Sequence, residues 1–575
     1  MRDLIGKIKN INLLRFSNPD TKTTDIFFIS LLIILFSVRF INLGGFDLQS
    51  WDEALYAFRA KSIYFFGCFF DQSAYSIGGL YSATHPPLYV WFTALAFYLF
   101  GISEFSVRFF SAFLGLGSMI MVYLIAKNIF NSKIAFFSTL LLLVNPFFTF
   151  WTMQGQFDSA LSFFSSAVFY FYIISAKKNT NNNIIFAGLM LGLALMTKLF
   201  VALYVLIVIL LYEYFGKDKI NWKNIFKLFC ISAIIALPWH LFMIVSHSNF
   251  DMFFFLKQAQ LYERTFFGIE ANSKELGLFF YINQLFVYLP FFIIPIIYFI
   301  LLNFKILKNS ILFLWMFVYF IIISIVSTKL PVYIIQIFVP AIVTGVYYYF
   351  EHLNSERSKL SKFLFLSFIL LFIFWSLDHQ FRIDIKNVLA GKEESSLLEL
   401  LFSYKNMILL FLAIETVLVL LIFFVKYNCA NIIITAYSII CVFIYFDITS
   451  LPSLQNYNSG VKELVTALND ACNSNNCNNI NGCIIGEGEN PQFTFYTDGS
   501  DAGWRTDIKF KRLSPKNKID EIYKYLFSNN LKNSYIIYEK SDLYLAAYSS
   551  PEKVIPAKYK KLIETREYIL YILDD

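Results

Sequence analysis

Thirteen long apolar runs follow one another along this chain, with short polar segments between them. Most have the ~17–25 residues that a helix needs to cross the hydrocarbon core of a bilayer, and only 184–197 is clearly short. The pattern therefore predicts an α-helical polytopic membrane protein with about thirteen transmembrane helices. The runs are 25–43, 106–126, 134–152, 157–175, 184–197, 199–215, 225–246, 283–303, 311–326, 332–350, 361–377, 406–425 and 430–447.

A further apolar stretch, 87–100, is shorter and rich in aromatic residues, as is typical of a helix in the membrane interface. If it does not cross the membrane, every short basic loop lies on the same side as the basic N-terminus. If it crosses, nearly all of those loops fall outside, against the positive-inside rule. We therefore expect an interfacial helix at 87–100. The same rule requires a turn at Thr197-Lys198, which divides 184–215 into two spans.

This topology predicts three parts: a cytoplasmic N-terminus (1–24), a transmembrane domain (25–447) whose first outer loop is 44–105, and an outer C-terminal domain (448–575). In the C-terminal part, strand-like runs alternate with amphipathic helix-like stretches, which indicates a small α/β domain. The strand-like runs are 482–486, 534–538 and 569–573, and the helix-like stretches are 459–471 and 516–528.

Three cysteines, Cys472, Cys477 and Cys483, cluster in this C-terminal part. Their spacing is not that of a zinc site and no histidine lies nearby. One disulfide among them is compatible with an oxidising compartment.

Composition and charge narrow the function classes. Hydrophobic residues make up 58% of the 575 residues and charged residues only 15%, whereas soluble globular proteins carry about 25% charged residues. The net charge of +7 is spread over loops, so it reflects topology and not nucleic-acid binding. The cytoplasmic loops are too short for a nucleotide-binding domain, and neither GxGxxG nor GxxxxGK[ST] occurs. We therefore expect any catalysed reaction to occur on the outer face and not to be driven directly by a nucleotide.

Asp52 and Glu53 directly follow the first apolar run, and Asp158 stands at the start of a later one. Charges beside membrane segments are costly and are often functional. Each also has a plain explanation, because outer loops tolerate acids and an acid at a helix N-terminus is favoured by the helix dipole. Carboxylates here can act as a general base or as ligands of a divalent cation, and the residues leave both roles open.

Isolated cations lie on the same face: Lys198, Lys329 and Arg264. Each lysine can be a snorkelling membrane anchor, and Arg264 can pair with its neighbour Glu263. His85, before two prolines, can be a turn residue. Taken together, cations at headgroup level fit a lipid phosphate, which Lys and Arg hold through charge-assisted hydrogen bonds.

Six motifs occur in order along the chain: Asp52-Glu53-x-x-Tyr56, His85-Pro86-Pro87-Leu88, Arg108, Asp158 with Leu161, Thr197-Lys198, and Lys329-Leu330-Pro331-x-Tyr333. This ordered set resembles the polyprenyl-phosphate-sugar glycosyltransferases of the GT-C fold, which include protein O-mannosyltransferases and the aminoarabinose transferases of lipid A. The resemblance covers about 25–350. Thr84-His85 before the prolines is closer to the mannosyltransferases, and Tyr89-Val90 departs from them.

The resemblance implies a bacterial inner-membrane enzyme that moves a sugar from undecaprenyl phosphate to a lipid A, glycan or protein acceptor at the periplasmic face. It implies that Asp52 is the base or a metal-linked carboxylate, that Glu53 supports it, and that Asp158 lines the cavity. It places further residues at the substrate and its phosphate: Tyr56, His85, Lys198, Arg264, Lys329 and Tyr333.

The alternative function is a polytopic transporter or lipid flippase. A transporter is expected to carry charges through the depth of its spans and often has inverted repeats. In this sequence the charges gather at one face and no repeat is visible.

Overall fold

The computed structural model describes residues 21–247, 280–289, 310–354 and 460–573, with short breaks at 42, 50–51, 78, 84, 144, 179–180, 217–220, 475–478, 486–490, 499–507, 514–533, 541–554, 556 and 566–567. Arg264, Cys477, the helix expected at 516–528 and the three runs between 361 and 447 lie outside these residues.

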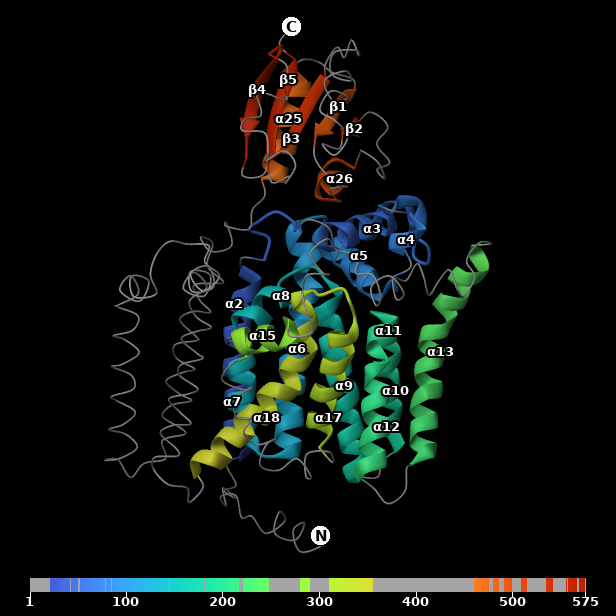
Figure 1. The fold of residues 1–575 in the computed structure, drawn as a ribbon, viewed down its shortest axis with the longest axis vertical. Helices are drawn as coiled ribbons and strands as arrows, with labels where there is room; N and C mark the ends of the chain where they lie inside the picture. The colour runs from blue at the N-terminus through green and yellow to red at the C-terminus, as the bar shows by residue number, and fades with distance from the viewer. Residues whose placement is uncertain are drawn as a thin grey trace, which may run out of the picture.

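The first part is a bundle of roughly parallel helices, capped at one end by helices that lie across it (Figure 1). The bundle helices are α2 (Thr21–Ile41), α6 (Glu104–Ile129), α7 (Ser132–Leu143), α9 (Phe157–Lys178), α10 (Asn181–Leu195), α12 (Tyr204–Gly216), α13 (Trp222–Ser246), α17 (Ile311–Ile325) and α18 (Ile335–Asn354). The shorter elements are α3 (Asp52–Phe66), η1 (Ser73–Tyr75), α4 (Leu80–Ala83), α5 (Leu88–Phe100), α8 (Pro146–Thr152), α11 (Leu199–Ala202), α15 (Phe280–Tyr288) and η3 (Pro331–Ile334).

Four helices in the described ranges are long and apolar enough to cross a membrane by length and composition. They are Glu104–Ile129, Phe157–Lys177, Trp222–Ser246 and Pro331–Tyr348. This supports a helical membrane protein, while the total of thirteen spans stays a prediction. Helix α5 covers the interfacial stretch and lies beside α3 across the end of the bundle (Figure 1). The turn expected at Thr197-Lys198 is present, between α10 and α11.

Two runs expected as single helices are broken in the structure. The run 134–152 is α7 and α8, separated at Asn145-Pro146: Asn145 caps α8 by accepting the N–H of Phe148 (3.0 Å), and proline is favoured in the first turn. The run 199–215 is α11 and α12, separated at Leu203. The apolar pattern missed both breaks because hydrophobicity continues across them.

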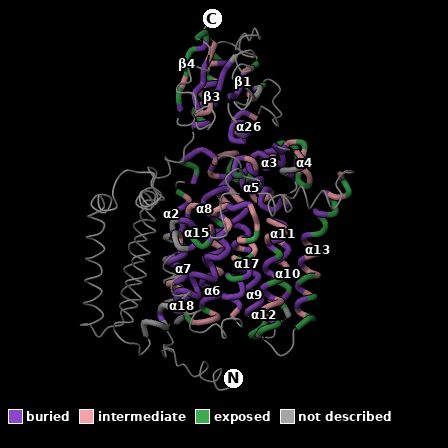
Figure 2. Tube along the Cα trace, in the orientation of Figure 1, coloured by how far each residue is buried: buried purple, intermediate pink, exposed green. Residues whose placement is uncertain are grey.

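The described part of 460–573 folds as a five-stranded sheet with two helices, here called the C-terminal unit (Figures 1 and 2). The strand order is β2-β1-β3-β5-β4, with β1 parallel to both β2 and β3 and the β5 pairings antiparallel. Its elements are α25 (Val461–Ser474), β1 (Ile480–Ile485), α26 (Pro491–Thr497), β2 (Ile508–Leu513), β3 (Ser534–Glu539), β4 (Tyr559–Glu564) and β5 (Tyr568–Leu573).

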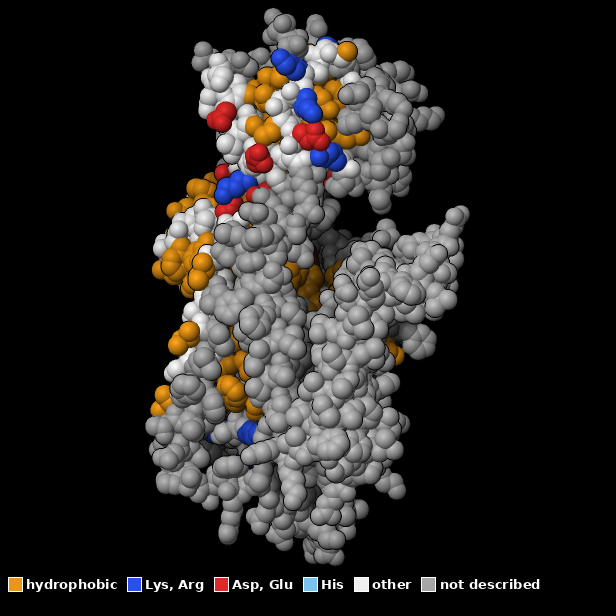
Figure 3. Space-filling model, turned by 90° about the vertical axis from the view of Figure 1, so that its left-hand side faces the viewer, with side chains coloured by type: hydrophobic (Ala, Val, Ile, Leu, Met, Phe, Trp, Pro, Cys, Tyr) orange, Lys and Arg blue, Asp and Glu red, His pale blue; other side chains and the backbone are white. Residues whose placement is uncertain are grey.

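The strand-like runs expected from sequence fall on the inner strands β1, β3 and β5, and α25 covers the expected helix 459–471. The edge strands β2 and β4 were missed. Both carry lysines between apolar residues, as edge strands often do to prevent pairing with other chains. Charged side chains are visible on this unit in Figure 3, whereas the visible described side chains of the helical part are mostly hydrophobic.

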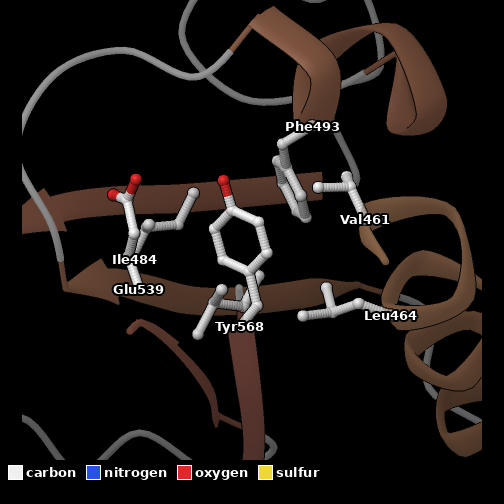
Figure 4. A pocket seen from close by; sticks show the side chains of 7 residues that line it. Val461, Leu464, Ile484, Phe493, Glu539 and Tyr568 are labelled. Atoms are coloured by element: carbon white, nitrogen blue, oxygen red, sulfur yellow. The ribbon is translucent and has the colours of Figure 1, made fainter. Parts of the chain in front are cut away.

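A pocket of about 280 Å³, part of it open to solvent, lies between the helices and the sheet of the C-terminal unit (Figure 4). Its lining is apolar except for Glu539 and the hydroxyl of Tyr568. The apolar lining residues are Val461, Leu464, Ile484, Phe493 and Ile537.

Gly482 in the inner strand β1 tests the packing of this unit. A Cβ at this position meets the Tyr535 backbone oxygen at 2.2 Å and the Phe510 ring at 2.7 Å. We expect Gly482→Val to destabilise the unit by about 1–3 kcal/mol through overpacking, although Val favours strands. Limited proteolysis of the purified protein should show faster cleavage within 460–573. Lys509→Ala, at an exposed position of β2, is the control, and equal cleavage rates would contradict the packing argument.

Candidate functional site

The two acids at the start of α3 have different surroundings. Asp52 is the first residue of the helix and is exposed. Glu53 is 0% exposed. Neighbouring helical residues point about 100° apart, so one carboxylate faces the outside while the other faces the protein.

Glu53 forms a buried two-point ion pair with Arg108 of α6. Its Oε1 lies 2.8 Å from Nε and its Oε2 lies 2.9 Å from Nη2. The same carboxylate accepts the backbone N–H groups of Gln49 (2.5 Å) and Gly155 (2.7 Å). Both oxygens are thus engaged within the protein, which gives Glu53 a structural role; its expected part in the site beside Asp52 stays a prediction.

The guanidinium of Arg108 also organises the outer segment 43–49. It donates to the backbone oxygens of Leu43 (3.0 Å), Phe46 (2.9 Å) and Asp47 (2.8 Å), and it lies 3.7 Å from the centroid of the Phe46 ring. With the two bonds to Glu53, all five N–H groups of the guanidinium have acceptors. Arg108 belongs to the sequence motif but was not expected as a site residue; the signal available was an arginine at the start of an apolar run.

An aromatic contact joins α3 to the start of α9. Tyr56, one turn after Asp52, packs on Phe157 with ring centroids 3.9 Å apart. The His85 ring stacks on Phe157 at 5.8 Å and lies 6.2 Å from Tyr56. Because residues four apart share a helix face, Asp52 lies on the same face of α3 as Tyr56, and Asp158 directly follows Phe157 in α9.

Asp158 and Lys198 bring opposite charges together at the start of α9. Lys198 Nζ lies 3.4 Å from Asp158 Oδ1 and 4.9 Å from the centroid of the Tyr333 ring. Gln336 donates to the backbone oxygen of Asp158 at 3.2 Å. The side chains come from α9, the turn before α11, η3 and α18, so distant segments of sequence meet here.

Lys329 is bound by backbone oxygens. Its ammonium donates to the backbone oxygens of Ile323 (3.1 Å), Ser324 (2.7 Å) and Val326 (2.5 Å) at the end of α17. A cation is favoured at this end of a helix, and burial lowers the pKa of Lys329. All three of its N–H groups are used in this arrangement, so the phosphate contact expected from sequence requires its release.

Arg59 is a further buried residue that sequence reasoning missed. It lies one turn after Tyr56 and is 0% exposed; its Nη2 donates to the His85 backbone oxygen (3.1 Å) and to Gln72 Oε1 (2.9 Å). Burial lowers its pKa to about 10, against the opposing influence of Tyr56 and Asp71. Arg59 therefore fixes the segment that carries His85. The sequence signal was an arginine among the apolar residues of 54–60.

In the described ranges, no three His, Cys, Asp or Glu side chains come together as a metal site. Cys483 is a buried thiol in β1, and burial raises its pKa to about 12.

Comparison with known proteins places this geometry in context. Residues 84–242 match the family model of the dolichyl-phosphate-mannose-protein mannosyltransferases. The chain also resembles the ArnT structure from Cupriavidus metallidurans bound to undecaprenyl phosphate, with a TM-score of 0.65, 15% identity and coverage of 96% of this chain and 98% of that one. The chain has the GT-C fold of ArnT. The resemblance to the GT-C superfamily expected from the motifs is thus confirmed.

Two relatives carry the name undecaprenyl phosphate-alpha-4-amino-4-deoxy-L-arabinose arabinosyl transferase. The one from Wigglesworthia glossinidia brevipalpis is 26% identical over 339 residues, and the one from Serratia proteamaculans is 25% identical over 352 residues. The matches cover 55% and 58% of this chain, and 57% and 61% of the relatives. The chain thus spans less than two thirds of the length of these relatives.

The Glu53–Arg108 pair generates a stability prediction. Glu53→Gln leaves a buried arginine without its counter-charge, which should lower the stability of the protein by about 3–5 kcal/mol. Thermal unfolding of the detergent-solubilised protein measures the loss. Glu564→Gln removes a partner of exposed lysines and should change stability by about 1 kcal/mol or less.

The double variant Glu53→Gln/Arg108→Met removes both charges and should recover part of the lost stability. An unchanged unfolding temperature for Glu53→Gln would show that the pair is not structural.

Proposed function

We propose that the protein is a membrane glycosyltransferase that moves one sugar from a polyprenyl-phosphate carrier to an acceptor hydroxyl at the periplasmic face of a bacterial inner membrane. The observation that carries this proposal is the packing of Tyr56, four residues after Asp52 in α3, on Phe157 at the start of α9, where the next residue, Asp158, pairs with Lys198. The ArnT fold supports it, because that enzyme's structure holds undecaprenyl phosphate. The acceptor is a lipid A, a glycan or a protein.

Asp52 is the general base. It is exposed at the first turn of α3, whereas both oxygens of Glu53 are bound to Arg108, Gln49 and Gly155. A well-placed base contributes roughly 10²–10⁴ in rate. Asp158 is unsuited to this role as it stands, since its carboxylate is paired with Lys198. It instead orients the lysine.

Lys198 binds the phosphate of the donor. The distance of 3.4 Å to Asp158 is long for a charge-assisted hydrogen bond, so the ammonium can turn toward an anion at little cost. Tyr333, whose ring centroid lies 4.9 Å from the Lys198 ammonium, and His85, which stacks on Phe157, are the further hydrogen-bond donors in this proposal. Lys329 and Arg264 are the remaining candidate cations of the phosphate site.

The reaction is a single displacement. The acceptor oxygen forms a bond to the anomeric carbon while the bond from that carbon to the phosphate oxygen breaks. The acceptor proton passes to the Asp52 carboxylate, and the electron pair leaves with the polyprenyl phosphate, whose negative charge Lys198 stabilises. No oxidant, reductant or nucleotide is needed.

Asp52→Asn should lower sugar transfer at least about 100-fold, because an amide does not accept the proton. The measurement is mass spectrometry of lipid A, surface glycans and exported proteins from cells that carry the wild type, the variant or no copy. Asp71→Asn is the control and should retain transfer. Asp71 lies in the same first outer loop (44–105) as Asp52, but it is paired with His247. Full transfer by Asp52→Asn would remove Asp52 from the mechanism.

Lys198→Ala should weaken binding of undecaprenyl phosphate to the purified protein about 10- to 100-fold, the effect of losing one hydrogen bond to a charged group. Lys198→Arg should restore most of the affinity. Lys127→Ala, in the last turn of α6, is the control. Wild-type affinity in Lys198→Ala would place the phosphate elsewhere, and transport of intact carrier without transfer would identify a flippase.

A further inference from the structure

Helix α26 of the C-terminal unit holds the backbone of the outer segment 43–49. The Leu48 N–H donates to the hydroxyl of Tyr496 (3.1 Å), and the Leu48 carbonyl accepts from the side chain of Gln492. The Tyr496 hydroxyl in turn donates to Glu104 Oε1 at 3.1 Å. One tyrosine oxygen thus joins the outer segment to the first turn of α6.

Two lysines, Lys462 and Lys61, make further contacts between the C-terminal unit and the helical part. The backbone N–H of Lys462 donates to Asp47 Oδ2 (3.2 Å), and its ammonium lies 2.7 Å from Glu104 Oε1. Burial raises the pKa of Asp47, an effect that the Lys462 N–H opposes. Lys61, on the same helix as Asp52, is buried and bonds Asp498 Oδ1 (2.6 Å) and the Phe495 backbone oxygen (2.5 Å).

The segment held by α26 is continuous with the site. The Asp47 carbonyl accepts from Arg108, and the Gln49 N–H donates to Glu53. Asp52 begins α3 four residues after Leu48. Residues 47–49 are therefore fixed on one side by the buried ion pair and on the other side by α26, and the first turn of α3 depends on both.

We propose that α26 is a positioning element for Asp52, and that Tyr496 is its positioning residue. Simple docking of the C-terminal unit does not need these bonds, since the rings of Phe495 and Tyr496 already pack against the hydrophobic core of the helical part. The hydrogen bonds to Leu48 add what ring packing lacks: they fix a backbone N–H and carbonyl in one orientation. The catalytic meaning of this role rests on the proposed function.

The first test measures the segment directly in the full-length protein. Tyr496→Phe keeps the ring and removes the hydroxyl. Amide hydrogen exchange of Leu48 and Gln49 should become about tenfold faster, while the unfolding temperature of the C-terminal unit stays near that of the wild type. Tyr559→Phe is the matched control, because the buried Tyr559 hydroxyl has no hydrogen-bond partner among the residues that the structure describes. Unchanged exchange at Leu48 and Gln49 in Tyr496→Phe would overturn the proposal.

The second test separates positioning from binding. Tyr496→Phe should lower transfer about tenfold and leave the affinity for undecaprenyl phosphate unchanged, because the phosphate site lies on other segments. Faster exchange with unchanged transfer would overturn the link to Asp52. If the wild type neither binds undecaprenyl phosphate nor transfers sugar, the proposed function fails, and the exchange result still decides whether α26 holds residues 47–49.

Discussion

The buried pair of Glu53 and Arg108 organises the outer face of this protein. Two charges removed from water are costly, and they are retained here with every hydrogen bond of the guanidinium satisfied. Through these two side chains, the segment 43–49, the start of α3 and the turn before α9 are held together. Asp52 can therefore stand exposed on a fixed backbone, as its proposed role as general base requires.

Buried cations lie at two places where helices of the helical part end. Arg39 of α2 bonds Thr149, Thr152 and the Leu143 backbone oxygen, at the place where α7 gives way to α8. Lys329 fills the corresponding role at the end of α17. In a nonpolar environment a broken helix leaves backbone groups that need partners inside the protein. The arginine and lysine supply them, so a charged residue in an apolar run can mark a break as well as a substrate site.

How much the sequence predicted depends on the kind of signal. The apolar runs matched the long helices of the described ranges except at the two breaks, the positive-inside rule gave the turn at Thr197-Lys198, and the strand-like runs gave the inner strands, because burial dictates those patterns. Sequence reasoning put Asp158 and Lys198 on the same outer face, but nothing in it placed them 3.4 Å apart. The distinct surroundings of Asp52 and Glu53, the backbone partners of Lys329 and the tie between Leu48 and Tyr496 are products of tertiary packing, which no local pattern encodes.

The distance along the chain between Leu48 and Tyr496 is 448 residues. At about 5–20 residues per second, a ribosome needs roughly 20–90 s to make the intervening chain. During that time the outer segment is already made, while its last partners do not yet exist. The first turn of α3 is thus synthesised well before the helix that completes its contacts, so a nascent chain gains this arrangement only after α26 has been made.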